Sequence, residues 1–221
     1  MDSVPADFKE SVLCELSQKD TDSLKNLPSE TSWSSFASRE VSRYQITLTV
    51  DADNVVKCVF PTDPRTHFIE KVLVSDLCLP SQATPLPEDK LEKFVRFVGK
   101  RMAHRNSSLS LTALDSNLTI RKIQNKFYES FPSHVSFITI CLKYMETQSE
   151  QFLKAQVTQN TSLENVTLHG RWPQSTLTEL QKFLNSPKFK SLEALNGVKA
   201  QIPFELIDKI VRKWRAPEYC N

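Results

Sequence analysis

The residues of this sequence that could do chemistry are its histidines and its clustered acids, and their spacing does not predict a catalytic or metal site. A protein metal site needs several His, Cys or acidic ligands at close, regular spacing. The acidic pair Glu88 and Asp89 opens a predicted helix, where negative charge stabilises the helix dipole without any catalytic role. No Gly-x-Ser-x-Gly or His-Glu-x-x-His motif occurs. The four histidines have no second His or Cys close by in the chain: His67, His104, His134 and His169. We expect no metal, no cofactor and no enzymatic activity, and an enzyme with dispersed catalytic residues has no positive support.

Glycine is scarce, which excludes whole classes of nucleotide-binding enzyme. The chain has three glycines in 221 residues, Gly99, Gly170 and Gly197. Rossmann and P-loop folds need two or three glycines within a few residues, so that the backbone can approach a phosphate. Gly170 and Gly197 each follow a predicted strand, and we expect a positive φ there. Gly99 lies inside a helical pattern and predicts close packing or a weakened helix end.

Composition predicts an ordinary globular protein of the cell interior. Lys and Arg number 28 against 26 Asp and Glu, and 39% of residues are hydrophobic. This balance does not favour nucleic-acid binding, and no apolar run is long enough to span a membrane. The amino terminus has early acids and no leader-like apolar stretch, so we expect a cytoplasmic or nuclear location. Five unevenly spaced cysteines predict reduced, mostly buried thiols: Cys14, Cys58, Cys78, Cys141 and Cys220.

The amino-terminal part divides into two segments with different residue patterns. Residues 1–40 predict three short helices that share one apolar seam. From Tyr44 to Val50, apolar and polar residues alternate, the tetrapeptide at 51–54 predicts a turn, and 55–60 returns as a second strand. We therefore expect a β-hairpin connector over 41–66.

From residue 67 to 221 the chain alternates short apolar runs with amphipathic ones. The runs predict strands at 69–79, 108–114, 134–142, 163–170 and 189–197, and helices at 87–105, 118–131, 149–160, 175–186 and 203–215. Five comparable strand positions are separated by 37, 26, 28 and 29 residues: Val72, Leu109, Val135, Leu163 and Leu192. Repeats of about 20–29 residues with one strand and one helix are typical of leucine-rich repeats. We expect an α/β fold with a leucine-rich-repeat-like strand–helix domain, and a general α/β domain with a mixed sheet is the alternative.

Two local features allow a functional and a structural interpretation. Trp172 lies between Arg171 and Pro173 after a predicted strand, where it could anchor a partner or simply pack over the next helix. The basic clusters at 100–105 and 212–215 end predicted helices, where cations complement the dipole.

Residues 4–36 resemble the F-box, the helical module that docks onto the Skp-type adaptor of a cullin ubiquitin ligase. Val4-Pro5 matches the opening Leu-Pro pair of the family, and Asp7 and Phe8 match the acid and the apolar residue that follow. The remaining matches to the family pattern are Val12-Leu13, Leu16, Asp20, Leu24, Leu27 and Trp33.

The whole chain is also similar to the divergent F-box-associated families that are expanded in nematodes. The similarity lies in the opening 1–5, the hairpin near residue 45 and the segment 161–195. In such families the carboxyl-terminal half is a strand–helix domain thought to select a target protein. The resemblance implies that 1–40 form an F-box-like all-α module, 41–66 a hairpin connector and 67–221 a target-binding domain.

The resemblance implies a substrate-recognition subunit of a Skp–cullin–F-box ligase, whose partners are a Skp-type adaptor and an unidentified target protein. The residues that would bind the adaptor are Val4, Pro5, Phe8, Val12, Leu13, Leu16, Leu24, Leu27 and Trp33. The alternative is a standalone interaction scaffold in which the same apolar seam only caps the first repeat. The target would bind outward-facing strand residues, and the sequence leaves open which of five these are: Ser75, Thr112, Thr139, Thr167 and Glu193.

Overall fold

The described part of the chain is an α/β fold built on one mixed sheet. The computed structural model describes residues 42–51, 53–59, 67–75, 83–102, 107–113, 118–131, 135–195 and 203–215, and the isolated positions Val12, Ser23, Leu24, Asn26, Trp33 and Ser34. The strands are β1 (Ser42–Val50), β2 (Val56–Val59), β3 (His67–Val74), β4 (Thr84–Pro85), β5 (Ser107–Leu111), β6 (Phe137–Lys143), β7 (Asn165–His169) and β8 (Ser191–Leu195). The described helices are α4 (Glu88–Arg101), α5 (Leu118–Ser130), α6 (Glu146–Gln159), α7 (Thr176–Leu184) and α8 (Phe204–Arg215).

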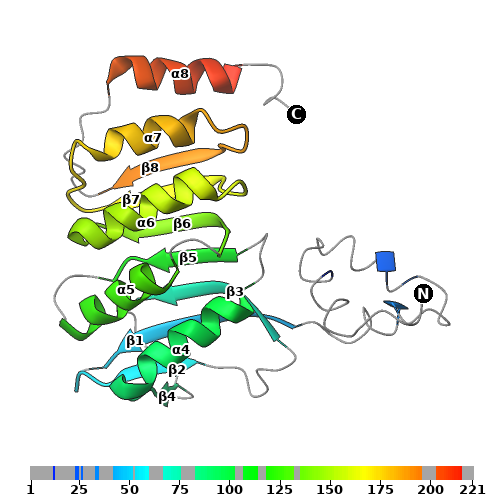
Figure 1. Ribbon diagram of the computed structural model, residues 1–221, viewed down its shortest axis with the longest axis vertical. Coiled ribbons are helices and arrows are strands. Elements are labelled where there is room, and N and C mark those ends of the chain that lie inside the picture. Colours follow the sequence, from blue (N-terminus) through cyan, green and yellow to red (C-terminus); the bar gives the residue numbers. More distant parts are fainter. Residues whose placement is uncertain are drawn as a thin grey trace.

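The sheet has the strand order β4-β2-β1-β3-β5-β6-β7-β8. β3 pairs in parallel with β5, and from β5 onward each strand pairs in parallel with the next one along the chain and is followed by a helix. β1 pairs in parallel with β3, whereas β2 and β4 add antiparallel strands at the other end. The units therefore stack in chain order (Figure 1).

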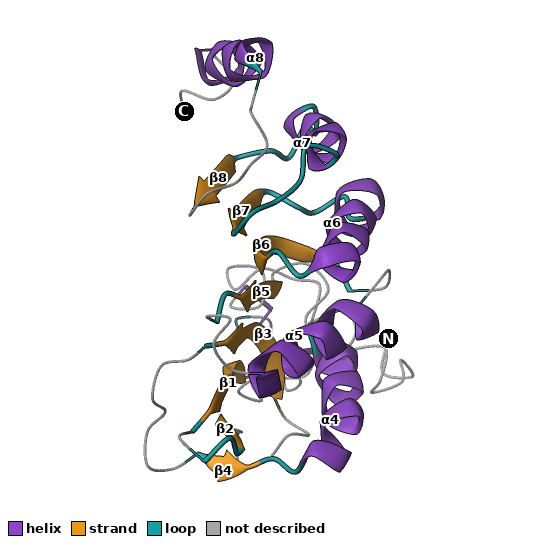
Figure 2. Ribbon diagram, turned by 90° about the vertical axis from the view of Figure 1, so that its left-hand side faces the viewer, coloured by secondary structure: helices purple, strands orange, loops and turns teal. Residues whose placement is uncertain are grey.

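Helices α4 to α7 lie on one face of the sheet, as the view along the strands shows, whereas α8 lies beyond the edge strand β8 (Figure 2). No described helix or strand covers the opposite face. Alternate strand residues consequently point either into the helix layer or away from it.

The core lies between the sheet and the helices. Two lateral rows of buried apolar side chains run across the strands, and burial of each such side chain contributes about 1.5–3 kcal/mol. The first row is Ile46, Val72, Leu109, Ile140 and Val166, and the second is Leu48, Val74, Leu111, Leu142 and Leu168. The helices bring large buried residues against them: Val95, Ile123, Phe127, Phe152, Leu180 and Phe183.

In β3 and β6, two apolar residues that lie three positions apart, rather than two, are buried on the same face. An extra residue in each of these strands explains the spacing. In β6, Ser107 pairs with Phe137 but Ser108 pairs with Thr139, so Ile138 is inserted as a bulge. In β3, the pairs of Tyr44 and Gln45 skip one residue in the same way. A bulge places two residues opposite one, so apolar residues three apart both reach the core. Phe137 and Ile140 are accordingly both fully buried.

The predicted strand and helix runs from residue 69 onward correspond to β3, α4, β5, α5, β6, α6, β7, α7, β8 and α8. The hairpin is confirmed by the antiparallel pairing of β1 with β2. Its turn is held by the Asp51 carboxylate, which accepts hydrogen bonds from the backbone N–H of Asp53 and Val55 at 3.0 and 2.8 Å. β4 was not predicted, because a strand of two residues that includes a proline carries no alternating pattern.

The predicted equivalence of strand positions was wrong in two units. Leu109 pairs laterally with Ile140, and Ile140 with Val166, so Val135 and Leu163 are not their equivalents. Both are buried but precede the strands. The corrected intervals along Val72, Leu109, Ile140, Val166 and Leu192 are 37, 31, 26 and 26 residues. The regular period is therefore confined to the last units.

The predicted division at residues 40 and 66 stays a prediction, although β1 and β2 share one sheet with the later strands. Of the nine predicted adaptor-binding residues, Val12, Leu24 and Trp33 are described, and each is helical and half-buried. The others lie outside the described residues: Val4, Pro5, Phe8, Leu13, Leu16 and Leu27.

The glycine predictions are confirmed where the structure describes them. Gly170 has φ +88°, a conformation that costs a residue with a Cβ. Gly99 lies in α4 against the ring of Phe131, and a Cβ added there would lie 2.6 Å from Cε1 of that ring. Close packing is therefore the reason for Gly99. Gly197 lies outside the described residues.

Substitution of Gly99 separates helix propensity from packing. In a helix interior, Gly→Ala normally stabilises by about 1 kcal/mol. We expect Gly99→Ala to lower the free energy of unfolding by about 1–3 kcal/mol instead, because Phe131 is fully buried and cannot move freely. Urea denaturation of Gly99→Ala, Phe131→Leu and the double variant checks this. The double variant should recover part of the loss, because leucine lacks the overlapping atom, and a stabilised Gly99→Ala would contradict the packing.

A second stability prediction concerns a buried amide. Gln124 of α5 is fully buried, and neither its Nε2 nor its Oε1 has a hydrogen-bond partner among the residues that the structure describes. Burying an unpaired amide costs about 1–3 kcal/mol. We expect Gln124→Met, of similar volume, to raise the melting temperature, whereas the neighbouring exposed substitution Lys122→Met should change it little. A lowered melting temperature for Gln124→Met would mean that the amide is satisfied in solution.

Candidate protein-binding surface on the sheet

The surface that the fold leaves uncovered by described helices is the second face of the sheet, which we call the open face. Its side chains alternate along each strand with the buried rows. The described residues of the open face are Gln45, Thr47, Lys71, Leu73, Ser108, Ser110, Thr139, Cys141, Lys143, Asn165, Thr167, His169, Ser191, Glu193 and Leu195. Most of them are small and polar. Such a face is unusual in a parallel sheet, because parallel sheets are commonly covered by helices on both faces and are then apolar on both.

The first lateral row of the open face is a ladder of side-chain hydrogen bonds. It runs through Thr139, Asn165 and Ser191 on three neighbouring strands. The Ser191 hydroxyl donates to Asn165 Oδ1 at 2.8 Å, and Asn165 Nδ2 donates to Thr139 Oγ1 at 3.2 Å. These bonds fix the direction of each side chain, so the row presents preorganised donors and acceptors.

The second lateral row runs through Ser110, Cys141, Thr167 and Glu193. The Thr167 hydroxyl donates to Glu193 Oε2 at 3.5 Å. Burial raises the pKa of the Cys141 thiol, and hydrogen bonds with Ser110 and Thr167 oppose that rise. The thiol is therefore protonated at neutral pH, and the row is neutral apart from Glu193.

Two further groups lie where the parallel strands end. Lys143 is 9% exposed, and its Nζ donates to the carbonyl of Ala113 at 3.2 Å. Burial and the charge of Lys143 lower the pKa of His169, while Glu193 opposes them. The imidazole is consequently neutral at physiological pH.

The turn after β7 shows whether Trp172 is an exposed anchor for a partner or a packed residue. This side chain is fully buried, its Nε1 donates to the carbonyl of His169 at 2.9 Å, and its ring centroid lies 5.4 Å from that of Tyr144. The interpretation as an exposed anchor for a partner was wrong. Packing accounts for this tryptophan, because its only polar atom is satisfied inside the fold.

Of the five residues proposed to face outward, the structure brings Thr139, Thr167 and Glu193 onto the open face. Ser75 is 7% exposed and follows β3 in the interior, so it is not available to a partner. Thr112 follows β5 and is half-buried. The sequence analysis did not select Ser110, Asn165 or Ser191. Each of the three lies one residue before a position of the buried rows or of their continuation in β8. In an alternating strand, that position predicts a side chain on the open face.

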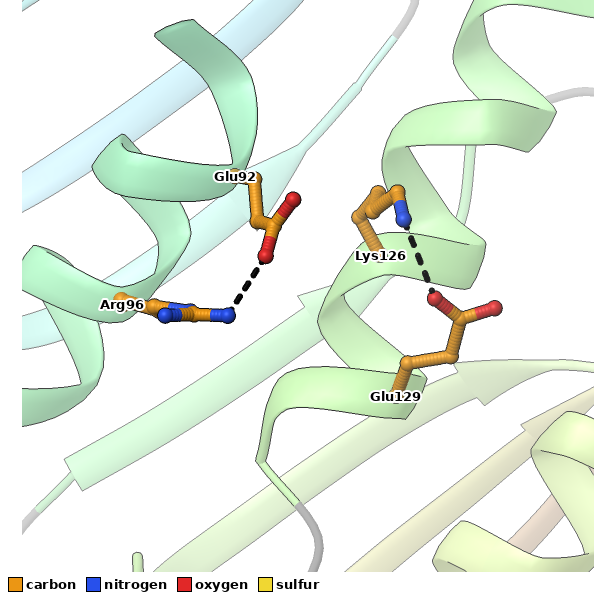
Figure 3. A network of polar contacts seen from close by, with 4 residues as sticks. All are labelled: Glu92, Arg96, Lys126 and Glu129. Atoms are coloured by element: carbon orange, nitrogen blue, oxygen red, sulfur yellow. Dashed lines mark hydrogen bonds and ion pairs between the residues drawn. The ribbon is translucent and has the colours of Figure 1, made fainter.

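Other hollows lie on the helix layer rather than on the open face. A groove of about 520 Å³ between α4 and α5 is lined by Glu92, Arg96, Gly99, Lys100, Lys126, Glu129 and Ser130. Each acid in it pairs along its own helix, Glu92 with Arg96 at 2.6 Å and Glu129 with Lys126 at 3.3 Å (Figure 3). Lys100 lies in the last turn of α4, where a cation complements the helix dipole.

A smaller hollow of about 280 Å³ lies between α6 and α7. Its Glu150 carboxylate already accepts the Tyr144 and Ser175 hydroxyls at 3.1 and 3.3 Å. Among the described residues, no group of three or more His, Cys, Asp or Glu could hold a metal ion. The described helices include none that is long and apolar enough to cross a membrane.

Comparisons of this chain with protein-family models, with curated proteins and with solved structures found no match.

Two adjacent residues of β7 test which face is open. Val166 is fully buried toward the helices, whereas Thr167 is half-buried on the open face. We expect Val166→Ala to lower the free energy of unfolding by about 2 kcal/mol, and Thr167→Ala by less than about 1 kcal/mol. Urea denaturation measures both. Equal, large losses would mean that a second layer covers Thr167.

Proposed function

We propose that this chain is the substrate-recognition subunit of a Skp–cullin–F-box ubiquitin ligase, and that the open face binds the protein to be ubiquitinated. The observation that carries the proposal is a wide sheet face, uncovered by described helices, whose polar side chains are held in hydrogen-bonded rows. Six parallel strands at about 4.8 Å spacing give this face a width of roughly 24 Å, which suits a protein better than a small molecule.

The arrangement of the strands and helices favours recognition over catalysis. Strand–helix units in chain order, with their helices on one side, are the arrangement of a leucine-rich-repeat-like array, which uses its strand face for binding. Small-molecule sites are concave and mostly apolar, and the two hollows described above lie instead among charged residues of the helix layer. Among the described residues of the open face, Glu193 is the exposed acid and the Cys141 thiol is protonated, which favours binding over nucleophilic catalysis.

The assignment to a ubiquitin ligase rests on the sequence pattern of residues 4–36. In the F-box the apolar face of the first long helix contacts the adaptor, and Val12, Leu13 and Leu16 occupy that face in this sequence. Three or four buried apolar side chains, each contributing about 1.5–3 kcal/mol, are enough for the centre of an interface.

Co-purification with a Skp-type adaptor tests the proposal. We expect the full chain to co-elute with the adaptor, and Val12→Asp with Leu16→Asp to abolish the complex, because two carboxylates cannot be buried in an apolar interface. Ser11→Asp introduces the same group one residue before Val12, at a position outside the predicted apolar seam, and should retain binding. Failure of the wild-type chain to bind would contradict the ligase assignment.

The scaffold alternative makes a different prediction for the same segment. If residues 1–40 are a docking module, their deletion should leave a folded domain that has lost only the adaptor. Circular dichroism and the melting temperature measure whether the domain is folded. If this deletion unfolds the chain and the intact protein binds no adaptor, residues 1–40 are a cap rather than a docking module.

A further inference from the structure

The carboxyl-terminal end of the sheet presents an unpaired strand edge. β8 pairs with β7 on one side, and no described residue pairs with its other side. The opposite end of the sheet is blunted, because β4 has two residues and one of them is Pro85. β8 has five residues and no proline, so its free side offers a continuous set of backbone donors and acceptors.

The last helix extends beyond that edge with part of its apolar side uncovered. Ile210 of α8 packs against the core, whereas Phe204 and Ile207 are 77% and 45% exposed. α5 and α6 each contact a helix on both sides, but α8 is the last described element and lies beyond β8 (Figure 1). These two exposed apolar side chains therefore lie on the element beyond β8, where no described residue covers them.

We propose that an extended segment of a partner protein pairs with the free edge of β8 as an added strand, with apolar side chains against Phe204 and Ile207 and a basic side chain beside Glu193. This is β-strand addition, in which main-chain hydrogen bonds supply affinity and alternate side chains supply specificity. The proposal does not depend on adaptor binding, because it uses residues at the far end of the array.

The lateral rows specify the chemistry of the added strand. Leu192 and Ala194 continue the two buried rows, so the residues beside them must be apolar to extend the core under α8. Glu193 ends the row of Cys141 and Thr167 and is exposed, and its one described side-chain hydrogen bond is the 3.5 Å contact from Thr167. A Lys or Arg in the adjacent strand complements this carboxylate, whereas an acid there is repelled.

A pair of short synthetic peptides tests the proposal on the full-length protein. Both alternate valine with threonine, and they differ only in a central lysine or glutamate. We expect the lysine peptide to shift the backbone amide signals of Ser191–Leu195 in an NMR titration and to bind roughly threefold to tenfold more tightly than the glutamate peptide. Glu193→Lys should reverse this preference. Ile207→Asp should abolish binding of both peptides, whereas Leu118→Asp, at an exposed leucine on α5, should change neither.

Three outcomes would overturn the inference. The first is the absence of amide shifts in β8 of the wild-type protein with either peptide. The second is equal binding of the two peptides that Glu193→Lys leaves unchanged. The third is a dimer of the protein alone, seen by analytical ultracentrifugation and dissociated by Ile207→Asp, because the edge would then be occupied by a second copy of this chain.

Discussion

The described helices α4 to α7 all cover the same face of the sheet, and this constraint decides most of the molecule. It makes the parallel strands β1, β3, β5, β6 and β7 alternate residues of the buried rows with residues on the open face. Ile140 and Val166 are fully buried, for example, while their neighbours Thr139 and Thr167 are only half-buried. The stability of the array comes from the lateral contacts of the buried rows and the helices behind them. The side chains of the open face therefore vary without loss of this core.

An uncovered parallel sheet still has to form a stable surface, and the side chains of the open face achieve this with each other. Ser191, Asn165 and Thr139 form a hydrogen-bonded row across three strands. Such rows hold donors and acceptors in fixed directions, which reduces the conformational entropy that a partner must offset on binding. The same rows end abruptly at β8, where Glu193 and the apolar side of α8 are exposed. The proposed recognition surface and the proposed edge site thus have one structural origin.

The sequence was sufficient for the order of strands and helices from β3 to α8, because each amphipathic run is long and separated from the next by turn residues. It was insufficient for register. The bulge at Ile138 inserts one residue into β6, and no propensity of that residue indicates it. The equivalence of Val135 and Leu163 failed because both are buried residues that precede their strands.

Side-chain environments were the second limit of the sequence. The sequence could not decide between an exposed and a buried Trp172, because the hydrogen bond to the carbonyl of His169 forms only in the folded turn. It predicted Thr139, Thr167 and Glu193 as candidates, but Ser110, Asn165 and Ser191 were missed for lack of a register. The sequence did predict the environment of two glycines. Glycine is favoured where φ is positive, as at Gly170, or where a Cβ would clash, as at Gly99.

Solvent exposure of methyl groups tests the central claim most directly, and it needs no substitution. A soluble paramagnetic gadolinium chelate relaxes the methyl signals that it can approach. The account predicts strong relaxation of the Thr139 and Thr167 methyls in the full-length protein and little relaxation of those of Ile140, Val166 and Leu168. Equal protection of both sets in the monomer would show that another part of the chain covers the open face, and would contradict its role as a recognition surface.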